Sequence, residues 1–219
     1  MRRLLWATAL GGAVTIVLAL TADLPATLGA LARFQWTLAP VVAAAVLANY
    51  ALRFVKWHFY LHRLSIPLPC RQSLLVFLAG FTMSITPGKV GELLKAALVR
   101  DLIGESLSRV ASVVMAERLT DVAGLLLLSA LGATALPHGG LLLAAVAGLL
   151  VLAIGVLRTR WLADWLHARL LDGGRLSRLA EPLRVFLGAG RTLVAPVTLA
   201  WAILLSVVSW FFELSLIHI

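Results

Sequence analysis

The sequence predicts an all-α, polytopic integral membrane protein, a helical bundle with a broken re-entrant hairpin. Of its 219 residues, 61% are hydrophobic and 13% are charged, whereas soluble domains have about 45–50% and about 25%. The mean hydropathy is +0.98. Apolar runs long enough for crossings of about 20 residues recur along the chain. The predicted spans are residues 4–22, 38–60, 110–133, 140–157 and 193–213, with the re-entrant hairpin at 73–99.

The two ends of the chain differ in character. Arg2 and Arg3 precede the apolar run 4–22, which is longer than the 7–15 residues of a signal-peptide core and is followed by no clean A-x-A site. We therefore expect a retained first span. The last six residues, LSLIHI (214–219), resemble the translation of a sequencing adapter. We expect them to be a non-native tail on a membrane domain, residues 1–213, that is incomplete at its C-terminus.

The second span, 38–60, ends in the basic and aromatic stretch NYALRFVKWHFYLHR. Aromatic and basic residues of this kind are typical of a belt at the membrane interface. Lys56 is expected to extend its amine to that interface. Arg53 lies deeper in the span and is the one residue of the stretch with a predicted functional role.

The segment 73–99 is interrupted by Pro87 and Gly88 in the stretch SITPGKVGELLKAALVR, residues 84–100. Its apolar first half has about 13 residues, too few for a full crossing. A hairpin that enters and leaves on one side fits this length. Irregular backbone at membrane depth must be buried in protein or line a wet cavity, so a polar niche is expected here.

The arginines support this topology. With 73–99 re-entrant, the basic loops, including the seven arginines of 158–192, lie on the side of Arg2 and Arg3, and the opposite loops hold only Arg33. The positive-inside rule then places the N-terminus in the cytoplasm. A full crossing by 73–99 would move the seven-arginine loop outside.

Charges of both signs occur at two places in these apolar segments. Lys89, Glu92 and Lys95 are spaced three apart along a helix-prone stretch. A cation in the first turn of a helix opposes the helix dipole, which favours a bound phosphate or carboxylate. The alternative is that Lys89 pairs with Glu92 or reaches water. Gly88 and Gly91 leave the backbone near this helix start open.

The second place is MAERLTDVAGLLLL in the span 110–133. Glu117 and Asp121 are four residues apart and share a helix face, with Arg118 beside them. A charge at membrane depth costs about 2.5–3.5 kcal/mol on insertion scales. We expect the three to pair with Lys89, Lys95 or Arg53 in a polar core. That core has two open interpretations, a binding site or an ion-pair scaffold that pins helices together.

Several function classes find no support in the sequence. The net charge of +9 is scattered between apolar runs, so nucleic-acid binding is not expected. His58 and His62 have no third ligand for zinc, and Cys70 is the only cysteine, so no metal or cofactor is expected. No nucleophile motif or Walker-type phosphate loop is present. No catalytic residue is therefore predicted.

TPGKVGELLKAALVR, followed about a dozen residues later by SVVMAERLTDVAGLLLL, resembles the flippase-like membrane domain of the lysylphosphatidylglycerol synthase superfamily. The upstream LRFVKW resembles that family's second span. The resemblance implies a multi-span inner-membrane protein that moves or presents lipids. No soluble aminoacyl-transfer domain is present, so synthase activity is not implied. The resemblance carries over two sets of residues: Thr86, Pro87, Gly88, Lys89, Gly91, Glu92 and Lys95, and Glu117, Arg118 and Asp121.

The leading hypothesis is a lipid flippase or permease that binds the headgroup of an anionic phospholipid or a lipid-linked substrate. Arg53, Lys89 and Lys95 would hold the phosphate. Glu92, Glu117 and Asp121 would hold a cationic group or balance the lysines. Two alternatives remain: a membrane transferase using a lipid-linked donor, with Glu117 or Asp121 as base, and a non-catalytic partner of a lipid-modifying membrane enzyme. The sequence predicts neither the headgroup nor the oligomeric state.

Overall fold

The computed structural model of the protein describes residues 29, 32–33, 35–81, 92–133, 137–159 and 177–216. The chain divides into two compact units, Met1–Ala43 and Ala44–Ile219. In the first unit, the 3-10 helix η1 (Trp36–Leu38) leads into the opening residues of helix α3 (Ala39–Arg63). The helices α4 to α10 that are named below begin in the second unit.

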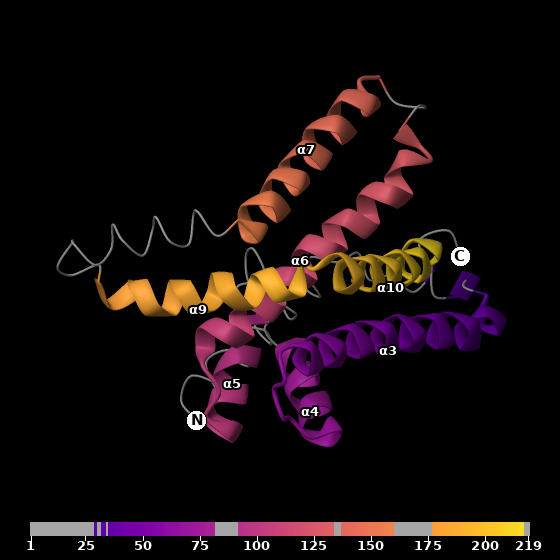
Figure 1. The fold of residues 1–219 in the computed structure, drawn as a ribbon. Helices are drawn as coiled ribbons and strands as arrows, with labels where there is room; N and C mark the ends of the chain where they lie inside the picture. The colour runs from indigo at the N-terminus through magenta and orange to yellow at the C-terminus, as the bar shows by residue number, and fades with distance from the viewer. Residues whose placement is uncertain are drawn as a thin grey trace. The chain divides into compact units, whose positions relative to one another are not determined.

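The second unit is helical, and no strand occurs among the residues described there, which confirms the predicted all-α membrane bundle (Figure 1). After α3, its helices are α4 (Cys70–Phe81), α5 (Leu94–Ile103), α6 (Leu107–Ala130), α7 (Gly139–Arg158), α9 (Ser177–Leu193) and α10 (Pro196–Ser215).

Helix α6 connects the second unit, because it packs against α5, α7, α9 and α10. Figure 1 shows α7 returning beside the C-terminal half of α6. Helix α3 joins α6 through the Tyr60 hydroxyl, which donates to Thr120 Oγ1 at 3.4 Å. It joins α4 through Trp57, whose Nε1 donates to Ser73 Oγ at 3.2 Å. The segments that carry the predicted site are thereby held around α6.

Local sequence signals fix the helix ends. Helix α3 ends before Ser65, which has a positive φ of 54° and is followed by two prolines that discourage a further helical turn. Helix α5 ends at Gly104, whose φ of 73° suits glycine and whose N–H donates to the Arg100 carbonyl at 2.8 Å. Ser106 caps α6, because its Oγ accepts from the Arg109 backbone N–H at 3.1 Å.

Among the described residues, three helical segments are long and apolar enough to cross a membrane: Trp36–Arg63, Gly139–Arg158 and Pro196–Ser215. Helix α6 has 24 residues and is about 36 Å long, but its middle is charged. Helix α4 has 12 residues and is about 18 Å long, too short for a hydrocarbon core of about 30 Å. The span at 4–22 and the turn of the hairpin at 82–91 lie outside the described residues. The first span and the re-entrant path therefore stay predictions.

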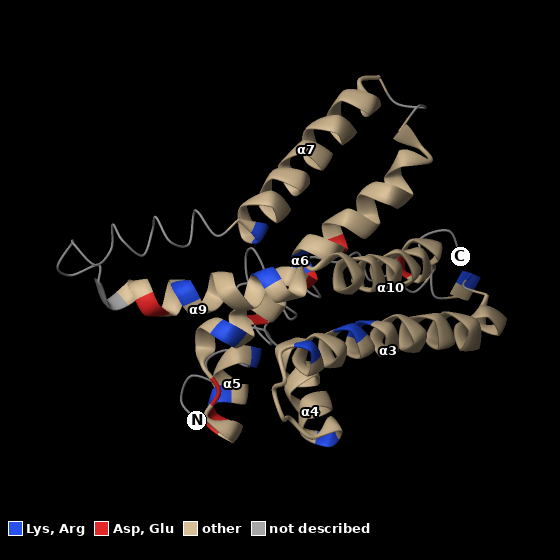
Figure 2. Ribbon diagram, viewed as in Figure 1, with Lys and Arg blue, Asp and Glu red and all other residues tan. Residues whose placement is uncertain are grey.

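Apolar side chains serve two purposes in this unit. Trp57, Tyr60, Val99, Val110 and Val113 are fully buried where α3, α5 and α6 meet. Large apolar residues of α7 point outward instead: Leu141, Leu142, Leu149, Val151 and Leu152. An outward apolar surface is what a lipid-facing helix requires. Figure 2 shows α7 without acidic residues and with one cation at its C-terminal end, Arg158.

Candidate functional site

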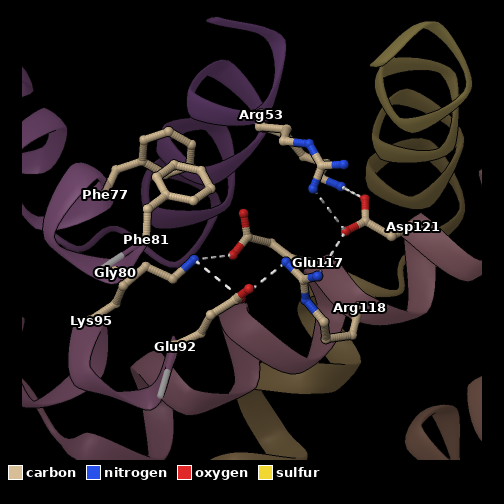
Figure 3. A pocket seen from close by; sticks show the side chains of 10 residues that line it. Arg53, Phe77, Gly80, Phe81, Glu92, Lys95, Glu117, Arg118 and Asp121 are labelled. Atoms are coloured by element: carbon tan, nitrogen blue, oxygen red, sulfur yellow. Dashed lines mark hydrogen bonds and ion pairs between the residues drawn. The ribbon is translucent and has the colours of Figure 1, made fainter. Parts of the chain in front are cut away.

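Eight charged residues gather where α3, α5, α6 and α10 approach one another. We call this set the charged cluster. Its members are Arg53 and Lys56 on α3, Glu92 and Lys95 at the start of α5, Glu117, Arg118 and Asp121 on α6, and Glu213 on α10. Most of the cluster is drawn in Figure 3, where side chains from the different helices point toward one another.

Lys56 is the most deeply buried charged side chain of the cluster, with 2% exposed. Its Nζ lies 2.5 Å from Asp121 Oδ1 and 2.8 Å from Ser206 Oγ, so it joins α3 to both α6 and α10. The prediction that Lys56 extends to the membrane interface is therefore wrong. The amine points inward because a carboxylate and a hydroxyl satisfy it there, whereas an unpaired charge in the interior would be strongly unfavourable.

Lys95 forms the second buried pair. Its Nζ lies 2.6 Å from Glu117 Oε2 and 3.9 Å from Glu92 Oε2. The same amine lies 4.4 Å from the centroid of the Trp57 ring, within range of a cation–π interaction. Gly80 of α4 makes room for the lysine stem, because a Cβ at that position would lie 2.8 Å from Lys95 Cγ. The stem is thus held between two helices with its amine directed at Glu117.

Arg118 links the two lysine pairs. Its terminal nitrogens lie 2.9 Å from Glu92 Oε2 and 3.3 Å from Asp121 Oδ2. The contact with Glu92 is close in distance but is not aligned as a hydrogen bond, and Arg118 Nε is buried with no hydrogen-bond partner among the described residues. The guanidinium therefore has unused donor capacity inside the cluster.

Arg53 forms the part of the cluster that includes α10. Its guanidinium contacts Glu213 Oε2, and its Nε donates to Asn49 Oδ1 at 3.2 Å. The amide of Asn49 donates to Glu213 Oε2 at 3.3 Å. The remaining carboxylate contact of Arg53, to Asp121 Oδ2, is 3.9 Å long, and the guanidinium lies 5.3 Å from the Trp210 ring centroid.

A close helix crossing positions the α10 side of the site. A Cβ on Gly124 of α6 would lie 2.9 Å from Ser206 Cβ and 3.0 Å from the backbone nitrogen of Val207. Without a side chain at Gly124, α10 comes near enough for Ser206 Oγ to donate to Asp121 Oδ1 at 3.3 Å while it accepts from Lys56. The glycine thereby determines which polar groups of α10 reach the cluster.

The described members of the cluster are electrically balanced and leave little space between them. Among the described residues, four cations face four carboxylates, so the formal charges sum to zero. The space between these side chains, bounded also by Phe77, Gly80 and Phe81, has a volume of about 20 Å³ (Figure 3). This is room for about one water molecule. The structure is therefore that of a narrow site whose charges pair with one another.

The structure brings together six of the residues that the sequence predicted: Arg53, Glu92, Lys95, Glu117, Arg118 and Asp121. The other five, Thr86, Pro87, Gly88, Lys89 and Gly91, lie outside the described residues. The expected pairing of the α6 charges with Lys95 and Arg53 is present. A role in substrate binding stays a prediction for all eleven residues.

Sequence reasoning missed Lys56 and Glu213 as members of the cluster, and Asn49, Ser206 and Ser209 as its polar partners. Two signals were available. Lys56 is three residues after Arg53 and therefore lies on the same side of α3. Glu213 is the only charged residue of α10, and a lone charge in an apolar helix indicates a partner inside the protein.

Metal-binding side chains are not gathered in the part of the chain that is described, since no three His, Cys, Asp or Glu residues there could hold one ion. His58 instead contacts Ser73, with 3.1 Å between Nδ1 and Oγ.

An all-α bundle with membrane-length helices and paired charges in its interior defines an integral membrane protein with a polar internal site. The family of the lysylphosphatidylglycerol synthase TM region has a model that matches residues 5–219, and the chain belongs to this family. Membership associates the protein with membrane lipids. No curated protein and no solved structure matches the chain.

Proposed function

We propose that this protein is a lipid flippase or permease of the bacterial cytoplasmic membrane that binds a lipid headgroup in the charged cluster. The observation that carries the proposal is a cluster of eight paired charges of both signs, five of them on buried side chains, inside a bundle that contains membrane-length helices. The headgroup would enter the cluster while the acyl chains stay in the bilayer. No described side chain distinguishes one headgroup from another.

The energetics favour a functional cluster over an incidental one. The charges of Glu117, Arg118 and Asp121 alone would cost about 8–10 kcal/mol on insertion if they were unpaired. Pairing with Lys56 and Lys95 offsets this cost. A buried ion pair nevertheless seldom stabilises a protein more than a pair of apolar residues of similar volume would. Apolar residues would therefore hold the helices together at least as well, which gives a binding role the advantage over a pure scaffold.

The small volume between the side chains suggests how a headgroup would bind. A volume of about 20 Å³ cannot hold a phosphate group, so the helices must separate and existing ion pairs must exchange for contacts with the lipid. In this scheme Arg53, Lys95 and Lys89 bind the phosphate. The carboxylates that they release pair with a cationic group of the lipid or with another lysine of the cluster. Exchange keeps every buried charge compensated throughout the movement.

Charge outside the cluster supports the orientation. Arg63, Arg71, Arg100 and Arg109 lie near the ends of α3 to α6 that we assign to the cytoplasm, and the connection between α6 and α7 carries no Lys or Arg. This asymmetry is the positive-inside pattern. Basic residues at the inner surface would also attract anionic lipid, by about 1 kcal/mol for each well-placed charge.

A translocation assay tests the proposal. The full chain is reconstituted into vesicles of phosphatidylethanolamine and phosphatidylglycerol that contain fluorescently labelled phosphatidylglycerol, and inward or outward movement is followed by dithionite quenching. The double variant Lys95→Met/Glu117→Gln should slow translocation by at least about tenfold, or 1.4 kcal/mol, and Lys89→Ala should also slow it. Glu105→Gln, which removes an acid paired with Arg109 outside the cluster, is the matched control.

Equal rates for the wild type and the cluster variants would reject these residue roles. Vesicles that show no translocation above protein-free vesicles would reject transport itself. Product formation from a lipid-linked donor would then favour the transferase alternative, and a requirement for a second membrane enzyme would favour the partner alternative.

A further inference from the structure

Glu213 differs from the other carboxylates of the charged cluster in exposure. Its side chain is 41% exposed, whereas those of Glu92, Glu117 and Asp121 are between 3% and 8% exposed. It lies in the last turn of α10. The two side chains that it contacts, Arg53 of the cluster and the nearby Asn49, both belong to α3. Glu213 is therefore less enclosed by the protein than the other three acids and can leave the cluster more easily.

Arg53 depends on Glu213 for its one close carboxylate contact. Its Nε is used by Asn49, and Asp121 Oδ2 lies 3.9 Å from its NH1 atom. Glu213 occupies the NH2 atom at the edge of the guanidinium. A guanidinium presents the same fork of donors to a carboxylate and to a phosphate. Glu213 thus stands where a phosphate oxygen would bind.

The charge balance leads to the same assignment. Without Glu213, the cluster holds four cations and three carboxylates, a formal charge of +1. A phosphodiester carries one negative charge, so its arrival with departure of Glu213 restores neutrality. If Glu213 stayed, the eight described side chains and the phosphate would together carry one negative charge, which is costly for the buried groups. Glu117 and Asp121 are poorer candidates for release than Glu213 because their side chains are only 3% and 8% exposed.

From this geometry we propose that Glu213 is a specificity-determining residue that occupies the phosphate position on Arg53 when no lipid is bound. A singly charged phosphate binds there by displacing the Glu213 carboxylate from the Arg53 guanidinium. The inference rests on the proposed function, because it assumes that the cluster takes a lipid phosphate. Beyond that function, it names Glu213 as the residue that the lipid must displace. It also explains why the site without lipid is electrically neutral.

Binding to the full chain in detergent tests this competition. The probe is dioctanoyl phosphatidylglycerol, with dioctanoylglycerol as the ligand without phosphate and inorganic phosphate as the free anion. Glu213→Gln should tighten phosphatidylglycerol binding by about tenfold and leave dioctanoylglycerol binding unchanged. Glu105→Gln should leave both unchanged. An equal gain for inorganic phosphate would identify the free anion, and not the lipid headgroup, as the source of the phosphate.

A double-mutant cycle tests the route of the effect. If Glu213 acts through Arg53, then Glu213→Gln should change binding when Arg53 is present and have no effect in an Arg53→Met background. An equal gain in both backgrounds would mean that Glu213 repels the lipid through its charge alone, which would overturn the shared-position proposal. Weaker or unchanged binding by a folded Glu213→Gln protein would also overturn it.

The wild-type protein offers a measurement that needs no variant. Displacement should expose Glu213, so phosphatidylglycerol should raise its modification by a carbodiimide, measured by mass spectrometry. Modification that falls or stays constant while the lipid binds contradicts displacement. Failure of the wild type to bind phosphatidylglycerol at all would instead reject the proposed function, and this inference with it.

Discussion

Replacing Lys95 by methionine separates the two interpretations of the charged cluster, scaffold and binding site. Methionine keeps an unbranched side chain against Trp57, Phe77 and Gly80, so the main change is loss of the ammonium charge. The companion variant is Glu117→Gln, which removes the opposite charge of the same pair. The double variant removes both charges and leaves no unpaired partner within that pair.

The contact distances set the expected magnitudes. Lys95 lies 2.6 Å from Glu117 and 3.9 Å from Glu92, and because Coulomb energy falls as 1/r, the second attraction is about two-thirds of the first. Lys95→Met removes both attractions and should lower the free energy of unfolding by about 4–5 kcal/mol. Glu117→Gln should cost about 3 kcal/mol, because Lys95 keeps Glu92 and the Trp57 ring. The double variant should lose about 1 kcal/mol.

The assay is reversible unfolding of the full chain in mixed micelles, followed by tryptophan fluorescence. It is carried out on the wild type, the two single variants and the double variant, which together form a double-mutant cycle. With these losses, the expected coupling energy between the two substitutions is about 6–7 kcal/mol. Additive losses, with the double variant as unstable as the sum of the singles, would refute the buried pair. A stable double variant that no longer binds phosphatidylglycerol would establish that the charges serve binding and are dispensable for the scaffold.

The remaining predictions concern the positions that place the cluster. Gly80→Ala puts a Cβ 2.8 Å from the side chain of Lys95 and should lower the free energy of unfolding by about 1–3 kcal/mol. The control is Gly148→Ala, where a Cβ would have no atom within 4 Å. This substitution should leave the free energy of unfolding unchanged or raise it by up to about 1 kcal/mol. Gly124→Ala should cost about 1–3 kcal/mol by forcing α10 away, and should weaken phosphatidylglycerol binding in the same detergent assay. Lys56→Met should cost less than Lys95→Met in the unfolding titration, because its carboxylate partner keeps two arginines at 3.3 and 3.9 Å. The opposite order would mean that these arginines do not compensate the carboxylate.

Local chemistry predicted the apolar helices. The apolar runs at 38–60, 140–157 and 193–213 match α3, α7 and α10 to within a few residues at their ends, because a helix in a membrane satisfies its backbone hydrogen bonds within its own segment. The same local reasoning located Glu117, Arg118 and Asp121 on one helix and required partners for them, since an unpaired charge at depth is unstable.

The identity of those partners was not a local property. Lys56 was expected at the interface because its own neighbours are aromatic and basic, yet its amine contacts Asp121 on α6 and Ser206 on α10. Which way a long side chain turns depends on what lies beyond its helix. Glu213 is separated from Arg53 by 160 positions in the chain, and no spacing rule connects residues so distant.

By itself, the sequence determined that this protein enters a membrane, that its charged span needs compensation and that it shares a family with lysylphosphatidylglycerol synthase membrane regions. Only the tertiary structure decided how the charges pair. Close approach at Gly80 and Gly124 fixes the rotation and separation of the helices, and these two quantities select which amine meets which carboxylate. Ion pairing weakens with distance through space, whereas the sequence records distance along the chain.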